Sequence, residues 1–342
     1  MPTAKRIDNP SFIPALFGEE LVNSPAQDKL PANASATTER TTSDPPRYSF
    51  SGHETFPLRY AWLPKGIQGL QRYPDLFSRD DAMVQLGVGK NMVSSIRHWC
   101  ETLRLIEHSQ RGVFTATSLG RALFAPDGWD PYLEDPATLW LLHWLLSSRP
   151  DRASTWYLAF TQYNEPSFTR DQLVDWLLRR AQHATNTRAT PSSVRRDVEV
   201  FLRTYTPAHS SRDLPMEDTF DCPLVELGLI REVERGTYEF VRGVKSSLPD
   251  VVFIFALHDY WQQTAASQHT LSFETLLYGA GSPGGVFKLS ENALVERLEH
   301  LPTWCRLTYN DTAGMRLVLR QSQLGGQLDL LTILSQYYGR NL

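Results

Sequence analysis

The sequence predicts a mainly α-helical fold with short β-hairpins, built from two or three winged-helix or helix-turn-helix-like units behind a disordered tail. Two observations lead to this prediction. The segment "AMVQLGVGKNMVSSI" has the spacing of two helices joined by a glycine turn. The order helix, helix, short hairpin also recurs loosely in three parts of the chain. At 342 residues and 41% hydrophobic content, the chain is long enough for two or three globular units.

The domain organisation follows from shifts in composition. The first 46 residues are rich in Pro, Ala, Ser, Thr, Asn and Asp, a composition that does not offset the entropy of ordering. Ordered structure is expected from about Tyr48. The expected parts are a disordered tail over 1–46, an N-terminal winged-helix-like domain over 47–149, a helical middle domain with a β-hairpin over 150–266, and a small C-terminal α+β, winged-helix-like domain over 267–342.

Composition also excludes several classes of protein. The net charge is −4, so a nucleic-acid site would have to be a local patch of Lys and Arg. Cys100, Cys222 and Cys305 are far apart and form no C-x-x-C pair, which argues against a disulfide framework or a thiolate zinc site and favours a reducing compartment. Signal-peptide and bilayer-spanning patterns are missing, so we expect a cytoplasmic protein without a membrane partner.

The helix-turn-helix pattern gives the first candidate site. Helices are expected over Asp80–Leu86 and Lys90–Leu103, with Gly87 at positive φ between them and a hairpin following as a wing. Polar side chains on the second helix would reach phosphates and base edges in a major groove. The side chains predicted to face outward and contact DNA are Lys90, Asn91, Ser94, Ser95, Arg97 and His98. The alternative is a protein-binding module, because fold does not fix function.

A second basic surface is expected in "RRAQHATNTRATPSSVRRD". Arginine pairs bidentately with phosphate, and the helix start at Ser192–Ser193 offers free N–H groups. The predicted DNA contacts are Arg188, Arg195 and Arg196. The alternative is a solvated face, on which these arginines pair with Asp175, Asp197 and Glu199. If both basic segments point the same way, they form one continuous strip.

The segment "SGHETFPLRYAWLPKG" (51–66) combines acid–base side chains with aromatic rings. His53 and Glu54 are adjacent, so in an extended chain their side chains point to opposite faces. Joint catalysis would need a third partner such as Asp80 or Asp259. We expect the segment to anchor the N-terminal domain and to present a possible functional edge formed by His53, Glu54, Arg59 and Lys65.

The sequence lacks the common motifs for nucleotide binding, metal binding and nucleophilic catalysis. A P-loop, a dinucleotide-binding glycine fingerprint, an H-E-x-x-H pair and a nucleophile elbow are all missing. The histidines form no i, i+4 ligand pair. We therefore predict no catalytic residue, no metal site and no cofactor. His258 follows an apolar helical run, and we expect a buried hydrogen bond there.

The motifs "FSGHETFPLRYAWLPKG", "LGVGKNMVSSIRHWC" and "SVRRDVEVFLRTY" carry a resemblance to a known family. From about Ser49 to the C-terminus the chain resembles an uncharacterised bacterial family with a domain of unknown function. Its members are encoded beside phosphoadenosine phosphosulfate reductase-like, sulfur-transfer proteins in DNA-modification (phosphorothioation) and phage-defence islands. The resemblance implies a setting in DNA modification or defence and carries over no catalytic residue.

The function predicted from these observations is that of a DNA-binding accessory or regulatory subunit of a bacterial DNA-modification or phage-defence system. Its expected partners are double-stranded DNA and a sulfur-transfer or other defence-system protein. One alternative is a non-catalytic scaffold whose helices bind a partner enzyme. A weaker alternative is a hydrolase or nuclease centred on His53 and Glu54.

Overall fold

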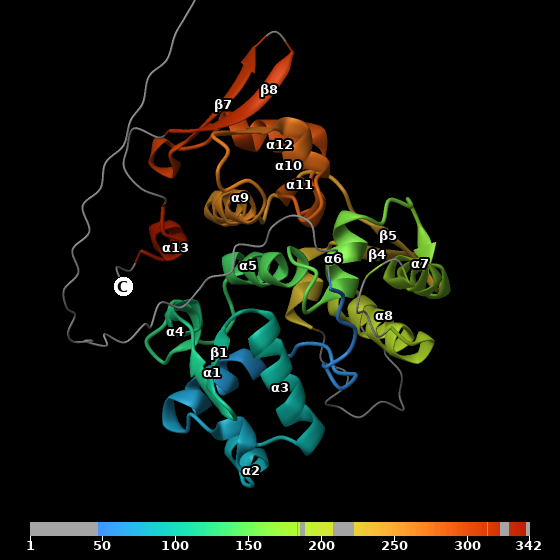
Figure 1. The fold of residues 1–342 in the computed structure, drawn as a ribbon, viewed down its shortest axis with the longest axis vertical. Coiled ribbons are helices and arrows are strands. Elements are labelled where there is room, and N and C mark those ends of the chain that lie inside the picture. Colours follow the sequence, from blue (N-terminus) through green and yellow to red (C-terminus); the bar gives the residue numbers. More distant parts are fainter. Residues whose placement is uncertain are drawn as a thin grey trace, which may run out of the picture. The chain divides into compact units, whose positions relative to one another are not determined.

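The computed structural model describes residues 47–182, 184, 189–207, 222–312, 314–321 and 328–339. The tail expected over 1–46 lies outside these residues. In the described chain helices dominate, and the strands form one two-stranded and two three-stranded antiparallel sheets (Figure 1). This mixed fold of helices and small sheets agrees with the predicted helices and hairpins, whereas the winged-helix assignment stays a prediction.

The first elements contain the predicted pair of helices and the hairpin after them. Gly87 joins the two helices at a φ of 64°, which a residue with a Cβ adopts only at a cost. At this turn the Lys65 Nζ donates a hydrogen bond to the Leu86 carbonyl at 3.0 Å. The elements are α1 (Trp62–Arg72), a 3₁₀ turn (Leu76–Ser78), α2 (Ala82–Leu86), α3 (Lys90–Thr102), β1 (Ile106–Gln110), β2 (Val113–Ala116) and α4 (Ser118–Phe124).

Three helices with few polar residues form the centre of the core. In the first of them every residue from Ala137 to Ser147 is buried, as expected for a helix that is apolar on nearly all faces. The Asp135 side chain accepts a hydrogen bond from the Ala137 N–H and caps this helix, and Pro136 occupies its first turn. The three helices are α5 (Pro136–Ser147), α6 (Ser154–Thr161) and α9 (Asp250–Thr264).

The middle of the chain combines two helices with a three-stranded sheet. The β-hairpin predicted for this part of the chain turns at Arg235-Gly236, and Gly236 takes a φ of 79° there. Thr190 and Ser193 form a reciprocal capping box at the start of the second helix. The elements are β3 (Phe168–Thr169), α7 (Arg170–Gln182), α8 (Pro191–Tyr205), a 3₁₀ turn (Pro223–Leu227), β4 (Ile230–Glu234) and β5 (Thr237–Phe240).

The C-terminal elements include the longest hairpin of the described chain, β7–β8. Ser290 caps the helix that begins at Glu291, and its side chain accepts from the Ala293 N–H at 3.3 Å. The elements are β6 (Thr270–Ser272), α10 (Phe273–Tyr278), α11 (Pro283–Val286), α12 (Glu291–Glu299), a 3₁₀ turn (Thr303–Cys305), β7 (Leu307–Thr312), β8 (Met315–Arg320) and α13 (Leu330–Tyr338).

Hydrogen bonds cross the domain boundaries expected at 149/150 and 266/267. The Ser49 N–H donates to the Ser154 Oγ at 2.7 Å, and the Lys288 Nζ donates to the Phe160 carbonyl at 2.6 Å. The stretch 45–342 accordingly forms one compact unit, and its division into three domains stays a prediction. Among the described helices, none is long and apolar enough to cross a membrane.

Candidate nucleic-acid interface

Helix α3 presents a polar face near its N-terminal end. Lys90, Asn91 and Arg97 are exposed, and Ser94 is half-buried beside them. Val93 and Ile96 are buried on the opposite face. Three of the six side chains expected to face outward on this helix therefore lie in solvent, and a fourth lies at the edge.

Ser95 and His98, which the sequence predicts to face outward, do not lie on the exposed face of α3. Ser95 is fully buried, and its Oγ donates to the His53 carbonyl at 3.0 Å. It lies one helical turn before Trp99, and residues four apart share a face, so Ser95 belongs to the inner face of α3. His98 is half-buried, with its ring edge-on to Trp99 at 5.6 Å, and burial lowers its pKa to about 4. Its imidazole is therefore neutral at physiological pH and adds no positive charge to the outward face.

His53 joins α3 to α8. Its ring lies 6.3 Å from that of Trp99 in a stacked arrangement, and its Nε2 lies 2.8 Å from the Asp197 Oδ1 on α8. The Thr55 N–H donates to the His53 Nδ1 at 3.2 Å. Because Nδ1 accepts a hydrogen bond, the ring proton sits on Nε2 and is donated to the carboxylate. Both ring nitrogens are thus occupied, and the pair acts as a buried clamp between two helices.

The backbone of the loop around His53 is strained. Ser51, Glu54 and Thr55 have φ values of 83°, 49° and 67°, in the left-handed region that residues with a Cβ seldom adopt. The Asp197 Oδ1 also accepts from the Ser51 N–H at 2.8 Å, so one carboxylate holds both the loop and the histidine. Strain of this kind persists only where the surroundings fix the backbone, and it is common at functional sites.

Two of the arginines predicted to contact DNA lie on α8 directly before Asp197. Arg195 and Arg196 precede it on the helix and are exposed, and the Arg196 Nε donates to the Ser192 carbonyl at 3.3 Å. Arg188 lies outside the described residues. Of the three acids in the alternative of a solvated face, Asp197 is not a surface partner of these arginines, because its carboxylate is 2% exposed and bonded to His53 and Ser51. The clamp thus links the helix that carries two exposed arginines to the helix with the polar face.

The other residues of the expected functional edge have mainly structural contacts. Arg59 lies over the rings of Phe56 and Trp62, at 5.7 and 5.4 Å from their centroids. Lys65 holds the carbonyl at the end of α2, so it supports the glycine turn. Glu54 is exposed. Arg59 and Lys65 therefore position the helix pair and its loop.

The geometry does not support His53 and Glu54 as a catalytic pair. His53 is 2% exposed with both nitrogens bonded, whereas Glu54 is exposed. Of the two third partners considered, Asp259 accepts hydrogen bonds from Trp144 and Arg149 instead. The ring nitrogens of His53 therefore have no lone pair free for a substrate.

Asp197 is the residue of this site that sequence analysis misses as a partner of His53. A signal for it exists. Asp197 follows Val194 by three residues and precedes Phe201 by four, so it lies on the apolar stripe of α8. A carboxylate on the core side of a helix needs a buried donor. The sequence could have identified such an acid, but not which residue donates to it.

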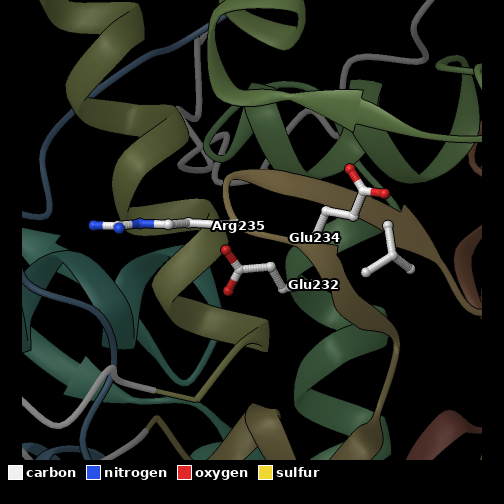
Figure 2. Close-up of a pocket in the computed structure, with 4 residues that line it drawn as sticks. Glu232, Glu234 and Arg235 are labelled. Atoms are coloured by element: carbon white, nitrogen blue, oxygen red, sulfur yellow. The ribbon is translucent and has the colours of Figure 1, made fainter.

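A separate hollow lies at the turn between β4 and β5. Its lining residues are Glu232, Val233, Glu234 and Arg235. Figure 2 shows the labelled side chains pointing in different directions instead of converging on one point. The Glu232 carboxylate accepts from the Gly236 N–H at 2.6 Å, which is a turn contact. We therefore regard this hollow as the open side of a hairpin.

Comparisons with known proteins agree along most of the chain. A family described as "Protein of unknown function (DUF4007)" matches residues 50–338. A solved structure described as "Magnesium ion-bound SspB crystal structure" has 32% sequence identity and a TM-score of 0.76, covering 86% of this chain and 89% of that chain. A second, "SspB crystal structure", has 31% identity and the same TM-score and coverage. No curated protein sequence matches the chain.

Proposed function

Because the chain belongs to the DUF4007 family and is similar to SspB over most of its length, we propose that it is a DNA-binding accessory or regulatory subunit of a bacterial DNA-modification or phage-defence system. The setting is the one implied by the resemblance of its "FSGHETFPLR" segment. The proposed ligand is double-stranded DNA. The proposed protein partner is a sulfur-transfer or other protein of the same system.

The exposed polar face of α3 is the observation that carries this proposal. Lys90, Asn91 and Arg97 are exposed on a helix that follows a glycine turn and precedes the β1–β2 hairpin. In a winged helix the second helix enters the major groove, where lysine and arginine reach guanine and asparagine reaches adenine. The hairpin then serves as the wing and brings the exposed Arg111 to the flanking backbone.

The arginines of α8 extend this surface to neighbouring phosphates. Arg195 and Arg196 are exposed on the helix that holds the His53 loop, and Arg188 belongs to the same predicted set. Contacts to phosphates fix orientation without reading sequence. The buried clamp links α8 to the loop that packs on α3.

The test is duplex binding by the full chain at two salt concentrations. Lys90→Glu combined with Arg97→Glu should abolish the shift of a duplex in a gel, while the folded structure is kept because both side chains are exposed. Wild-type affinity should fall about 10-fold or more between 50 and 200 mM salt if a few phosphates are neutralised. Parallel assays with plain and phosphorothioate-containing duplexes show whether modified DNA is preferred.

A matched control separates the groove assignment from a loss of net charge. Arg170→Glu with Arg235→Glu changes the net charge by the same amount at exposed positions on α7 and the β4–β5 turn. This control should retain binding. Equal losses in both double variants would show that only overall charge matters, and normal binding by the α3 double variant would disprove the role of that face.

A second candidate function is a protein-interaction scaffold. Met83 and Val84 on α2 are 44% and 79% exposed, an apolar pair next to the same glycine turn. Interfaces use methionine readily because its side chain adapts to different partners. Duplex binding that is missing or insensitive to salt, together with loss of a co-purifying sulfur-transfer protein in Met83→Ser/Val84→Ser, would favour the scaffold.

One of the two related SspB structures is described as bound to a magnesium ion. Within the stretches that the structure describes, no three His, Cys, Asp or Glu side chains are grouped as a metal site would need. Magnesium prefers octahedral oxygen ligands with carboxylates among them. The described residues therefore do not supply a protein-only magnesium site.

A further inference from the structure

A small arginine-lined pocket lies at the end of α3, away from the face proposed for the groove. It is formed where α3, α5 and the start of α6 meet, and its volume is about 150 Å³. Arginines dominate its polar lining. The lining residues are Thr102, Arg104, Leu145, Leu146, Arg149, Asp151, Arg152 and Ala153.

The hydrogen-bond donors of this pocket outnumber the acceptors. The buried Asp259 behind it accepts from the Trp144 Nε1 at 2.8 Å and from the Arg149 Nη2 at 3.1 Å. The Arg104 Nη2 lies 3.6 Å from the same carboxylate, beyond hydrogen-bond distance. Three buried guanidinium nitrogens, Nε and Nη2 of Arg104 and Nε of Arg149, consequently have no acceptor among the described residues.

The charges around the pocket are close to balanced, so its attraction for an anion comes from the unsatisfied donors. Arg152 lies 3.8 Å from the Glu101 Oε2, and the other oxygen of Glu101 lies 2.8 Å from His108. Asp151 is exposed at the rim. Three arginines and one aspartate line the pocket, and Asp259 and Glu101 behind it pair with the same arginines. Leaving buried donors without an acceptor costs about 1–3 kcal/mol each, so an anion is favoured there.

The backbone at Arg104 adds an independent observation. Arg104 has a φ of 59° just after the end of α3, the position where glycine is the usual residue. An L-residue adopts this conformation at a cost of about 1–2 kcal/mol. Arginine here keeps its guanidinium in the pocket despite the strain. Backbone strain of this kind clusters at active sites and ligand-binding sites.

We propose that this pocket binds one tetrahedral oxyanion of the phosphate class, held by the guanidinium groups of Arg104, Arg149 and Arg152. Guanidinium groups match phosphate oxygens bidentately, which ammonium groups do not. The volume fits a single phosphate group and lies well below the roughly 300–1,000 Å³ of sites that enclose drug-sized ligands. A nucleotide or a nucleic acid would therefore insert only a phosphate.

The phosphate group has two possible sources, a free phosphate ion and the backbone of a nucleic acid. The pocket lies at the C-terminal end of α3, about 20 Å along the helix from Lys90. That distance exceeds the roughly 12 Å width of a major groove. A helix lying in the groove would therefore place its end at the flanking backbone. The site itself does not depend on the DNA-binding proposal.

The test is calorimetric titration of the full chain with inorganic phosphate at constant ionic strength, with chloride as the reference anion. Wild type should bind phosphate and not chloride. Arg152→Gln should weaken phosphate binding about 10-fold or more, because one charged hydrogen bond is lost. Asp151→Asn should strengthen it several-fold, because a repelling carboxylate is removed. Arg104→Gly removes a guanidinium while relaxing the backbone, so it should fold and lose phosphate binding.

Arg170→Gln, on α7 and outside the pocket, is the control and should bind phosphate as wild type does. Wild type that binds no phosphate, or Arg152→Gln and Arg104→Gly that bind it normally, would overturn the proposal. A duplex that prevents phosphate binding identifies the backbone as the source, and independent binding identifies the free ion. Phosphate binding without any duplex binding would leave this pocket in place and remove the DNA-binding function.

Discussion

His53 and Asp197 are 144 residues apart in the chain and share a 2.8 Å hydrogen bond in the interior, with each side chain 2% exposed. The same carboxylate oxygen accepts from the Ser51 N–H. One side chain on α8 therefore fixes the loop that packs against α3. This contact connects the two surfaces for which we propose DNA binding.

Replacing Asp197 with alanine should destabilise the protein by about 2–4 kcal/mol, because the N–H groups of His53 and Ser51 lose their acceptor inside the protein. Asp197→Asn should cost less, since its amide oxygen still accepts. Urea denaturation of the full chain measures both. Glu199→Ala, an exposed position on the same helix, is the control and should change stability by less than about 0.5 kcal/mol. Similar losses for Asp197→Ala and Glu199→Ala would show that the clamp contributes nothing.

Gly52→Ala should destabilise the loop beyond the cost of its backbone conformation. Gly52 has a φ of 111°, and a Cβ there would lie 2.5 Å from the His98 Nδ1. Gly236, in the β4–β5 turn, has a φ of 79° and open space around it. Gly236→Ala should therefore cost only the conformational term, about 1–2 kcal/mol. A thermal midpoint for Gly52→Ala equal to that of Gly236→Ala would mean that the His98 ring moves aside freely.

Features set by neighbouring residues could be predicted from the sequence. The glycine turn at Gly87, the hairpin at Arg235-Gly236 and the Ser290 cap each depend on a few adjacent residues. Backbone conformation and capping are local properties, so a short window contains the information. The exposed positions of Lys90 and Arg97 follow from helical periodicity in the same way.

Features set by distant contacts could not be predicted. The side-chain pattern of α3 does not reveal that Ser95 packs on the His53 loop, because a serine suits either face of a helix. The convergence of Arg104 and Arg149 on Asp259 joins residues more than 100 positions apart. Pairing of this kind depends on how helices pack, which composition and periodicity leave open. The sequence therefore predicts the exposed polar residues of α3 but not the buried contacts that hold this helix in place.

Two buried histidines and the half-buried His98 should make the protein sensitive to mild acid. Burial lowers the pKa of His143 to about 3 and the pKa values of His98 and His258 to about 4. In the unfolded chain each titrates near about 6.5. Between these values the unfolded state binds more protons. The stability that the three neutral histidines contribute is therefore fully present above about pH 6.5. It is lost as the pH falls, by up to about 1.4 kcal/mol per pH unit for each histidine.

His258→Gln tests this acid sensitivity. The His258 Nε2 lies 2.9 Å from the Cys305 carbonyl, and a glutamine amide keeps a donor for that oxygen without titrating. Urea unfolding at pH 5.0 and 6.5 should show a smaller drop in stability for the variant than for wild type. His300→Gln, at an exposed position, is the control and should keep the wild-type pH dependence. An identical drop in His258→Gln would show that His258 does not contribute.

Lys288 should destabilise the native state at neutral pH. The side chain is buried, its Nζ donates to the Phe160 carbonyl at 2.6 Å and lies 4.1 Å from the centre of the Phe240 ring, and burial lowers its pKa to about 7. An unfolded lysine titrates near about 10.4. The unfolded state thus binds more protons above pH 7, so stability should rise with pH there.

Replacing Lys288 with methionine should leave stability at pH 7 unchanged or raise it, because a well-packed apolar chain often replaces a buried charge without loss. The rise in stability between pH 7 and 8 should also flatten. Lys245, whose pKa burial lowers to about 8, should supply the slope that remains. Measurements stay below about pH 8.5, where cysteines of the unfolded chain ionise. Lys90→Met, at an exposed position, is the control and should keep the wild-type slope. A marked loss of stability in Lys288→Met with an unchanged slope would mean that the ammonium group stabilises the fold.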